Sequence, residues 1–222
     1  PSFATWMTDT AIFDRDCRDC PRLSDFLDGV KRRYPDYYCR PVPPFGDPSA
    51  RFLIVGLAPG MHGANRSGRP FTGDHAGILL YQKLFKYGFA NRDHSEAVDD
   101  GLELLDSRIT NAVKCLPPDN KPVGAEINTC NAFLANELDT LPTGSVVLAL
   151  GGIAHRAIIK ALGRRQAEFK FAHAATHDLE HFTLLDSYHC SRYNTNTRRL
   201  TEPMFDEIFA LAREMLDKSS GE

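Results

Sequence analysis

The sequence predicts an α/β fold of three layers, in which a central four-stranded parallel sheet is flanked by helices. Two observations predict it: short apolar runs alternate with helical patterns, and each apolar run leads into a distinctive loop. This alternation is typical of a parallel sheet with crossover helices. The predicted strands are Arg51–Leu57, Arg108–Lys114, Ser145–Leu150 and Phe182–Tyr188.

Helices are expected where apolar residues recur at helical spacing between and beyond these strands. Clusters of proline and glycine at 41–48, 117–124 and 141–144 separate the elements. The 222 residues, 1–222, are most simply one domain. The predicted helices are Arg22–Arg33, His75–Tyr87, Ala125–Thr140, Ile153–Leu162 and Glu202–Leu216.

Composition limits the classes of protein to consider. Hydrophobic residues make up 42% of the chain, enough for a substantial core, yet no run approaches the roughly 20 apolar residues of a membrane span. No basic segment followed by an apolar one begins the chain, so we expect a cytoplasmic protein without a membrane partner. The net charge of −3 argues weakly against nucleic acid, but Arg192, Arg198 and Arg199 permit a basic face.

A glycine-rich loop, Gly56–Gly77, directly follows the first strand. Its six glycines let the backbone approach a ligand closely. It lacks the Lys-Ser or Lys-Thr pair of a plain phosphate loop. Its side chains can grip phosphate, stack on a ring and polarise water, which predicts a site for a nucleotide within a polymer; they are Asn65, Arg66, Arg69, Phe71 and Asp74.

The carboxyl ends of the strands should bring four segments to one cleft, because open parallel sheets bind ligands at that edge. The segments are the glycine-rich loop, 111–120, 151–152 and 187–197. In the last, Ser191, Asn194 and Thr195 can donate to phosphate oxygens. Arg192 and Tyr193 are long enough to enter a duplex where a base has left. The alternative is a solvated loop after a core-facing His189.

Four of the six cysteines form a plausible thiolate set: Cys17, Cys20, Cys115 and Cys130. Without an export signal, cysteines suggest ligands or reactive thiols more than disulfides. Zinc sites usually show two close pairs, whereas here the second pair is widely split, which favours a [4Fe–4S] cluster. Four ordinary buried cysteines are the alternative. Three histidines, His173, His177 and His181, are interpreted as solvated.

Taken together, these motifs resemble family 5 of the uracil-DNA glycosylase superfamily, close to family 4. The similar segments are GLAPG, GRPFTGDHAG, HCS followed by RYNTNT, CRDCPRL and KCLPP. They span roughly Cys17 to Phe205, nearly the whole chain. The resemblance implies a structural [4Fe–4S] cluster on the four cysteines and a monomer that removes uracil from DNA. It also implies that other deaminated bases, such as hypoxanthine and xanthine, are accepted by some members.

The resemblance carries roles onto individual residues. Phe71 matches the aromatic residue on which the extruded base stacks, and His189 matches the histidine that faces O2 of the base. Asp74 stands where family 5 places its candidate catalytic carboxylate, and Asn120 matches a polar residue implicated in the site. Family 4 has a carboxylate where this chain has Leu57, so the acid must come from elsewhere. Asp74 could instead cap the helix that begins at His75.

The sequence departs from the family pattern at two positions. Cys190 stands where many members have proline, and Asn111 stands where some family-5 relatives have a small apolar residue. The Asn111 amide offers a donor and an acceptor that complement O4 and N3–H of uracil and mismatch cytosine. Backbone amides at Gly56, Leu57 and Ala58 could add to the stabilisation of the departing base.

Two other functions stay open from the sequence. A non-catalytic iron–sulfur protein that binds DNA would use the cluster as a staple or redox sensor, and Asp74, Asn111 and His189 would be dispensable. A nucleotide hydrolase would need an acidic metal-binding pair beside the glycine-rich loop, where only Asp74 stands.

Overall fold

The computed structural model describes residues 13–179 and 181–219. The N-terminal stretch that was considered for an export signal lies outside the described residues. One sheet of six strands runs through the structure in the order β1-β3-β2-β4-β6-β5. The central four strands are parallel and confirm the four predicted strands. They are β2 (Phe52–Gly56), β3 (Ser107–Asn111), β4 (Ser145–Leu150) and β6 (Phe182–Ser187).

The prediction of four strands misses one short antiparallel strand at each edge. These are β1 (Phe45–Gly46), which pairs with β3, and β5 (Thr176–Asp178), which pairs with β6. They contain two and three residues and neither has a buried position, so neither produces the apolar run by which a strand is recognised in sequence.

The edge strand β5 also changes the environment of the histidines in this region. Nε2 of His177 lies at hydrogen-bond distance, 3.2 Å, from Oδ2 of the buried Asp186 carboxylate. His173 stacks on Tyr188, with ring centroids 5.0 Å apart. The interpretation of these two histidines as solvated is therefore wrong, whereas His181 is exposed as expected.

All five predicted helices are present, each within three residues of its expected ends. The sequence does not predict two short helices and two 3₁₀ turns, because segments of three to five residues are too short to show a helical period. The predicted helices are α1 (Pro21–Arg33), α3 (His75–Lys86), α4 (Gly124–Asp139), α5 (Gly152–Ala161) and α7 (Glu202–Ser219). The additional elements are α2 (Ala64–Ser67), α6 (Arg192–Asn196), η2 (Pro118–Asn120) and η3 (Gln166–Glu168).

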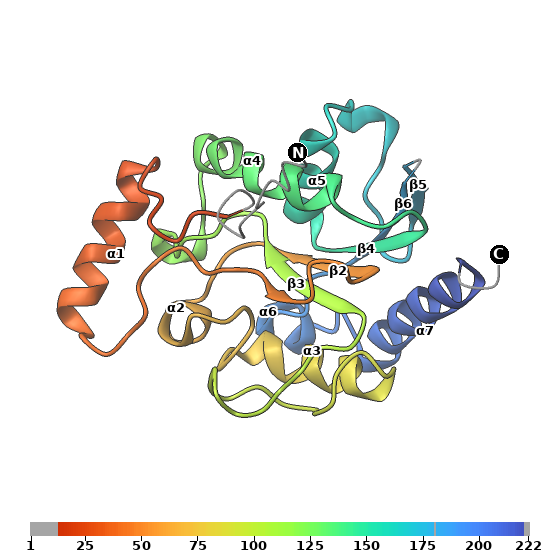
Figure 1. The fold of residues 1–222 in the computed structure, drawn as a ribbon, viewed down its shortest axis with the longest axis horizontal. Coiled ribbons are helices and arrows are strands. Elements are labelled where there is room, and N and C mark those ends of the chain that lie inside the picture. Colours follow the sequence, from red (N-terminus) through yellow and green to blue (C-terminus); the bar gives the residue numbers. More distant parts are fainter. Residues whose placement is uncertain (1–12, 180, 220–222) are drawn as a thin grey trace, which may run out of the picture.

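The helices form the two outer layers that the sequence predicts (Figure 1). Alternate side chains of a strand point to opposite faces, so in β2 Phe52 and Ile54 pack against α3 and α7. Leu53 and Val55 pack on the other face, against α4 and α5. The sheet is thus buried on both faces, and α1 stands beside one end of it (Figure 1).

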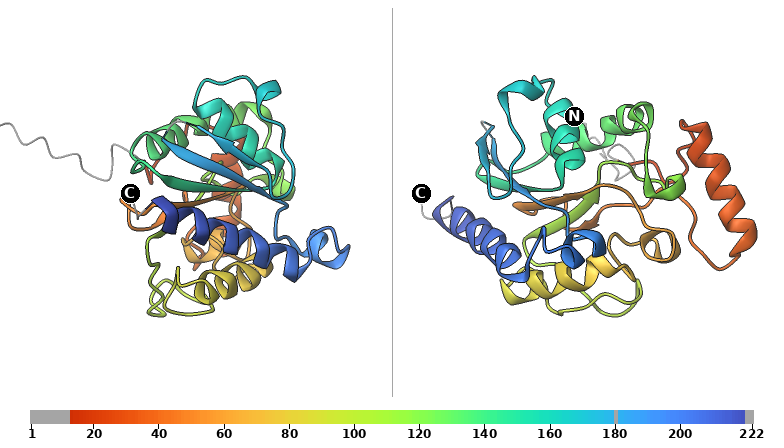
Figure 2. Two further views of the ribbon diagram at one scale, coloured as in Figure 1. Left: turned by 90° about the vertical axis from the view of Figure 1, so that its right-hand side faces the viewer. Right: turned by 180° about the vertical axis from the view of Figure 1, so that it is seen from behind.

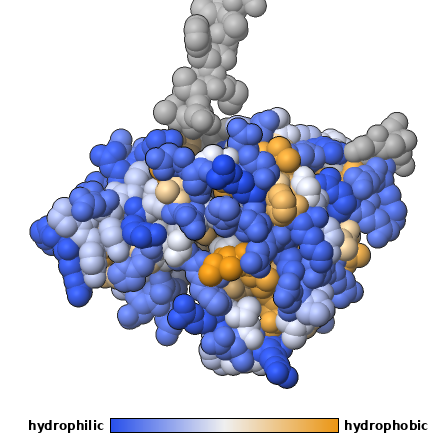
Figure 3. Space-filling model, turned by 90° about the horizontal axis from the view of Figure 1, so that it is seen from below, coloured by the Kyte–Doolittle hydropathy of each residue, from blue (hydrophilic) through white to orange (hydrophobic). Residues whose placement is uncertain are grey.

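The outer surface is mainly polar. Seen from the α3 side, hydrophobic residues gather in a few small areas surrounded by hydrophilic ones (Figure 3). Two of the large apolar side chains that are exposed, Ile78 and Phe85, lie on α3. Among the described residues, no helix is long and apolar enough to cross a membrane.

A buried ion pair joins α4 to the segment that follows β3. The Lys114 ammonium lies 2.8 Å from a carboxylate oxygen of Glu137 and also donates to the Thr110 hydroxyl. Both side chains of the pair are at most 3% exposed. The guanidinium of Arg108 approaches the second Glu137 oxygen at 3.5 Å. One carboxylate therefore compensates two largely buried cations.

We expect Glu137→Ala to lower the free energy of unfolding by about 3–5 kcal/mol, because it leaves the Lys114 ammonium buried without a counter-charge. Urea unfolding followed by circular dichroism measures this loss. The matched control is Glu214→Ala, which removes an exposed partner of Lys218 and should leave the unfolding midpoint unchanged. A loss below about 1 kcal/mol for Glu137→Ala would show that water reaches Lys114.

Candidate functional site

A cavity of about 590 Å³ opens at the carboxyl ends of the parallel strands. Strand register places these ends side by side, with Gly56 opposite Asn111 and Leu150 opposite Ser187. All four segments expected at this edge contribute to the cavity wall. They supply Leu57, Ala58, Phe71, Asp74, Asn111, Asn120, Gly151, Gly152, His189, Ser191, Arg192 and Asn194.

Gly56 lets two side chains approach each other behind the cavity. A Cβ atom at this position would lie 2.4 Å from Oδ1 of Asn111 and 2.7 Å from Cζ of Phe71. Such contacts are sterically forbidden, so only glycine allows the amide and the ring to occupy their places. Phe71 itself is buried and has a φ of +56°, which turns its ring back toward β2.

Asn111 presents an unsatisfied acceptor to the cavity. Its side chain is buried, and its Oδ1 atom has no hydrogen-bond partner among the described residues. Leaving a buried acceptor unpaired costs about 1–3 kcal/mol. Because Asn111 lines the cavity, a ligand with an N–H or O–H group at this depth would remove that cost.

Asp74 lies beneath the turn of the glycine-rich loop. Its Oδ2 accepts a hydrogen bond of 3.3 Å from the Ala64 amide. A Cβ atom at Gly63 would lie 1.8 Å from Oδ1, so the loop can close over the carboxylate only with glycine there. Asp74 occupies the N-cap position of α3, but its side chain makes no capping hydrogen bond. Burial raises the pKa of this carboxyl.

His189 follows β6 and faces Phe71 across the cavity wall. The two rings are nearly parallel, with centroids 6.2 Å apart. Burial lowers the pKa of His189 to about 4. The imidazole is therefore neutral near pH 7, with one N–H to donate. The side chain of Asn194 donates to the His189 carbonyl at 2.8 Å and so fixes the backbone that carries the ring.

Asn120 lies on the exposed rim of the cavity, at the end of η2. Asp119 and Asn120 both have positive φ, of +54° and +55°. Asparagine and aspartate tolerate this left-handed conformation better than most residues. The turn thereby brings the Asn120 amide to the same edge as Asp74, although the two lie far apart in sequence.

The segment 191–195 contains the N-cap Ser191 and most of α6 (Arg192–Asn196), which projects from the body of the molecule (Figure 2, left). Tyr193 at its tip is 73% exposed. The Ser191 hydroxyl oxygen accepts a hydrogen bond from the backbone N–H of Asn194 and so caps the helix. The O–H of Ser191 is left free to donate. The Thr195 hydroxyl donates to backbone carbonyls within the segment. Ser191 and Arg192 line the cavity, whereas Tyr193 and Thr195 do not.

The cavity wall also contains residues that were not singled out as site residues in the sequence, among them Phe171, Tyr188 and Arg199. Phe171 comes from the irregular segment before β5 and lies over Gly152, where an added Cβ would be 3.7 Å from its ring. Tyr188 directly precedes His189. The predicted strand Phe182–Tyr188 ends at Tyr188 and leads into the site, so the sequence contained a signal that Tyr188 lies at the cavity.

The four predicted cysteine ligands lie together at a second small cavity. Cys17 and Cys20 precede α1, Cys115 follows β3, and Cys130 lies on α4. Burial, and after it the neighbouring sulfurs, raise the pKa of Cys115. Clustered thiols whose pKa values are raised stay protonated unless cations replace the protons, so the donor set fits a metal group.

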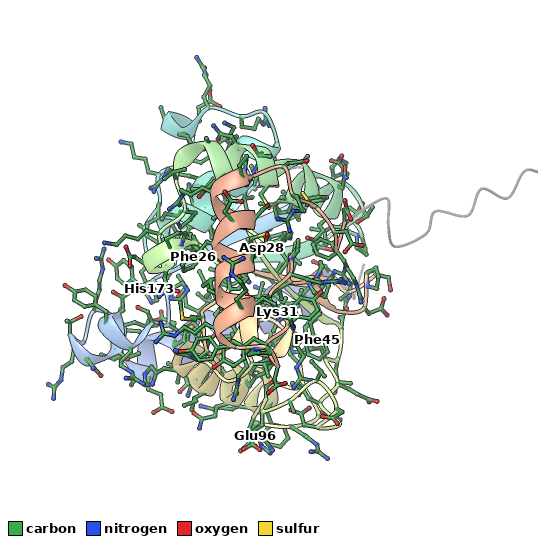
Figure 4. All side chains as sticks on the ribbon, turned by 90° about the vertical axis from the view of Figure 1, so that its left-hand side faces the viewer. Phe26, Asp28, Lys31, Phe45, Glu96 and His173 are labelled. Carbon is green, nitrogen blue, oxygen red and sulfur yellow. The ribbon has the colours of Figure 1, made fainter. Side chains whose placement is uncertain are left out.

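The first residues of α1 form part of the wall of the thiol cavity, through Leu23 and Ser24. The buried side chains of α1 include Leu23 and Leu27, while Asp28 and Lys31 lie on the outward side (Figure 4). The amide of Lys114 donates to the Cys130 sulfur at 3.3 Å. Cys39 and Cys190 are also buried, but they do not line this cavity and their sulfurs make other contacts.

Comparison with known proteins relates the chain to one family. The model of the uracil DNA glycosylase superfamily matches residues 43–213. The chain is 45% identical over 207 residues to the type-5 uracil-DNA glycosylase of Thermus thermophilus, covering 90% of this chain and 93% of that protein. It is 44% identical over 200 residues to the type-5 enzyme of Pyrobaculum aerophilum, covering 88% and 87%. A type-4 uracil-DNA glycosylase of Sulfurisphaera tokodaii is 30% identical over 178 residues, covering 77% and 74%.

The burial of His189 predicts an NMR titration midpoint of about 4 for its imidazole. Desolvation disfavours the charged form, so the ring should stay neutral until the pH falls well below the usual 6.5. Ring C–H shifts measured from pH 3 to 8 give the midpoint, and the spectrum of His189→Gln identifies the resonance. A midpoint at or above 6.5 would contradict the neutral imidazole.

Proposed function

The chain belongs to the uracil-DNA glycosylase superfamily, which makes it a hydrolase of DNA repair, and on this premise we propose how it acts. It extrudes uracil from DNA and hydrolyses the N-glycosidic bond, leaving an abasic site. The observation that carries the proposal is the buried, unpartnered Oδ1 of Asn111 beside Phe71 and His189.

Phe71 and Asn111 recognise the extruded base. The ring of Phe71 supplies a stacking surface, and base–aromatic stacking contributes about 1–3 kcal/mol. Oδ1 of Asn111 accepts the N3–H of uracil, and its amide N–H donates to O4. Cytosine presents an acceptor at N3 and a donor at position 4, so both contacts become mismatched. Uracil thus gives the unpaired Oδ1 of Asn111 a hydrogen-bond donor and removes the free-energy cost of leaving it unpaired.

His189 and Asp74 act on opposite sides of the breaking bond. The N1–C1′ bond electrons leave with the base, and the neutral His189 donates its N–H to O2 of the uracil anion. Backbone amides near Gly56, Leu57 and Ala58 add to this stabilisation. Asp74 orients a water molecule that attacks C1′ and accepts its proton, which is then released to solvent. The uracil anion takes up one proton from solvent, so the products are neutral uracil and the abasic sugar with no net release of protons.

The cavity rim holds the DNA. Asn120 places a polar group next to the reacting sugar, and Ser191 retains a free hydroxyl proton for a phosphate oxygen. Arg192 and Tyr193 on α6 are positioned to fill the gap left by the extruded base, because α6 projects from the molecule (Figure 2). Asn194 and Thr195 act mainly by bracing this segment, since Asn194 donates to the His189 carbonyl before it and Thr195 donates to the Ser191 carbonyl within it.

Other deaminated bases are a second class of substrate for the same site. The cavity of about 590 Å³ exceeds what one pyrimidine fills, so hypoxanthine and xanthine can enter. Asn111 favours the edge of uracil over theirs. We therefore place uracil first among the bases that the enzyme removes.

A [4Fe–4S] cluster held by Cys17, Cys20, Cys115 and Cys130 is the proposed cofactor. In a tetrahedral zinc site the sulfurs lie roughly 3.8 Å apart, because a Zn–S bond is about 2.3 Å. Among the described residues, the side chains that bring three ligand atoms within 4.8 Å of one another are His155, His177 and Asp186. The four cysteine sulfurs form no group of three within that distance, which supports a larger metal group. Its role is structural: it ties α1 and α4 to the end of β3.

The glycosylase proposal predicts cleavage of a uracil-containing oligonucleotide, revealed by alkali at the abasic site. His189→Ala should lower the rate of base release by about 100- to 1,000-fold, because the donor to the departing base is lost. The matched control is His181→Ala, a change at an exposed histidine before β6, which should retain full activity. Parallel substrates carrying hypoxanthine and xanthine define the base range. Tight DNA binding without cleavage of any substrate would instead support a non-catalytic iron–sulfur protein.

The cluster proposal predicts about four iron and four sulfide ions per chain after anaerobic purification. Cys115→Ser should lose this iron and the brown colour, because a hydroxyl replaces a thiolate ligand. Cys39→Ser is the matched control, since Cys39 is buried but does not line the thiol cavity, and its sulfur accepts from the Asn65 side chain. One zinc ion per chain in place of iron would contradict the cluster.

A further inference from the structure

A stack of side chains carries Arg199 to the cavity. The ring of His173 lies nearly parallel to that of Tyr188, with centroids 5.0 Å apart. The guanidinium carbon of Arg199 lies 4.8 Å from the centroid of the same tyrosine ring. Tyr188 and Arg199 both line the cavity of the proposed active site. The stacked guanidinium is therefore held at the mouth of the cavity.

Buried hydrogen bonds fix the foundation of this stack. His155 bonds through Nδ1 to Asp186 at 2.8 Å and through Nε2 to the Phe169 carbonyl at 2.9 Å. The side chains of His155 and Asp186 are at most 1% exposed. Because a carbonyl only accepts, Nε2 must donate, which ties the segment from Phe169 onward to β6.

The segment carries His173 to the end of β6 and holds it there. The Ala174 amide donates to the Asp186 carbonyl at 2.9 Å, and the Asp186 amide donates to the Ala175 carbonyl at 2.9 Å. Next to them, the Tyr188 amide donates to Nδ1 of His173 at 3.2 Å. The tyrosine that supports Arg199 is thus fixed on the backbone and on the ring.

Arg199 has no acidic partner within the described part of the chain. It forms a cation–π contact with Tyr188, but no ion pair or hydrogen bond to another described residue is found. Its side chain is exposed, so its five N–H groups are available to a ligand. By contrast Arg69, in the glycine-rich loop, is buried and paired with Asp100. A guanidinium that is positioned but unpaired is suited to a phosphate oxygen pair.

We propose that Arg199 binds the DNA phosphate that flanks the extruded nucleotide and thereby holds the strand at the cavity mouth. This inference rests on the proposed function, because only extrusion brings that phosphate to the rim. One face of the guanidinium contacts Tyr188, and its N–H edges remain free for the phosphate oxygens. Stacking limits the motion of the arginine before DNA arrives, so less conformational entropy is lost on binding.

The test measures affinity for DNA rather than activity. Fluorescence anisotropy gives Kd for an oligonucleotide with an abasic-site analogue at several KCl concentrations. Arg199→Gln should raise Kd about 10-fold and reduce the slope of log Kd against log salt by about 1, because one phosphate contact disappears. Arg198→Gln removes the same charge one residue away, outside the cavity wall, and should keep Kd within about twofold of the wild type.

Two further variants separate the charge from its positioning. Arg199→Lys should restore the salt slope but not the full affinity, because lysine keeps the charge and loses the planar fork. Tyr188→Leu should raise Kd about threefold with the slope unchanged, since the arginine stays but loses its support. Thermal unfolding of each variant confirms that the fold is retained.

The outcomes distinguish this inference from the proposed function. If the wild type cleaves uracil-containing DNA while Arg199→Gln keeps the wild-type Kd and salt slope, Arg199 is no phosphate ligand and this inference alone fails. Equal effects of Arg199→Gln and Arg198→Gln would also overturn it, because they would indicate a diffuse basic surface. If the wild type neither cleaves nor binds such DNA, the proposed function fails together with the inference.

Discussion

The site depends on one steric constraint, the absence of a side chain at Gly56. Strand register sets Gly56 beside Asn111, and the missing Cβ leaves the space that the Asn111 amide and the Phe71 ring share. Any larger residue would have to displace the Asn111 amide, the Phe71 ring or both. Gly56 and Asn111 are the last residues of β2 and β3, whereas Phe71 comes from the glycine-rich loop, so the ring of the loop packs into a space that the sheet defines. Of the two groups, the Asn111 amide is the one held on a strand of the sheet.

Burial acts in opposite directions on the two ionisable groups proposed for chemistry. It lowers the pKa of His189 and raises the pKa of Asp74, because in both cases it disfavours the charged form. A neutral histidine suits the departing base, since it can donate a hydrogen bond without giving up a proton. Asp74 is compensated by the Ala64 amide, whose hydrogen bond favours the carboxylate. The glycine turn supplies that amide, so the loop that encloses Asp74 also keeps it able to act.

The sequence predicts those strands and helices that bury a long enough run of residues to show an apolar pattern. The four parallel strands and five long helices each produce an apolar pattern, and their order fixes which segments meet at the strand ends. The edge strands β1 and β5 lack buried positions, and α2 and α6 are too short for a period. The stack of His173, Tyr188 and Arg199 depends on tertiary placement, because its members lie on three different segments. Asn111 was recognisable by type, but its unpaired oxygen is visible only in three dimensions.

Lys114 connects the thiol cluster to the recognition site. Its amide donates to Cys130 and its ammonium pairs with Glu137, so one residue is bound to α4 at two points. Asn111 lies three residues earlier and Cys115 one residue later. Between them, the amides of Ala112 and Val113 donate to the carbonyls of Gly56 and Leu57. A cluster on the four thiols would therefore fix the segment that leaves β3, and with it the position of the amide that reads the base. The proposed cluster, which takes no chemical step in the proposed reaction, would then act on base selection only through the position of this backbone.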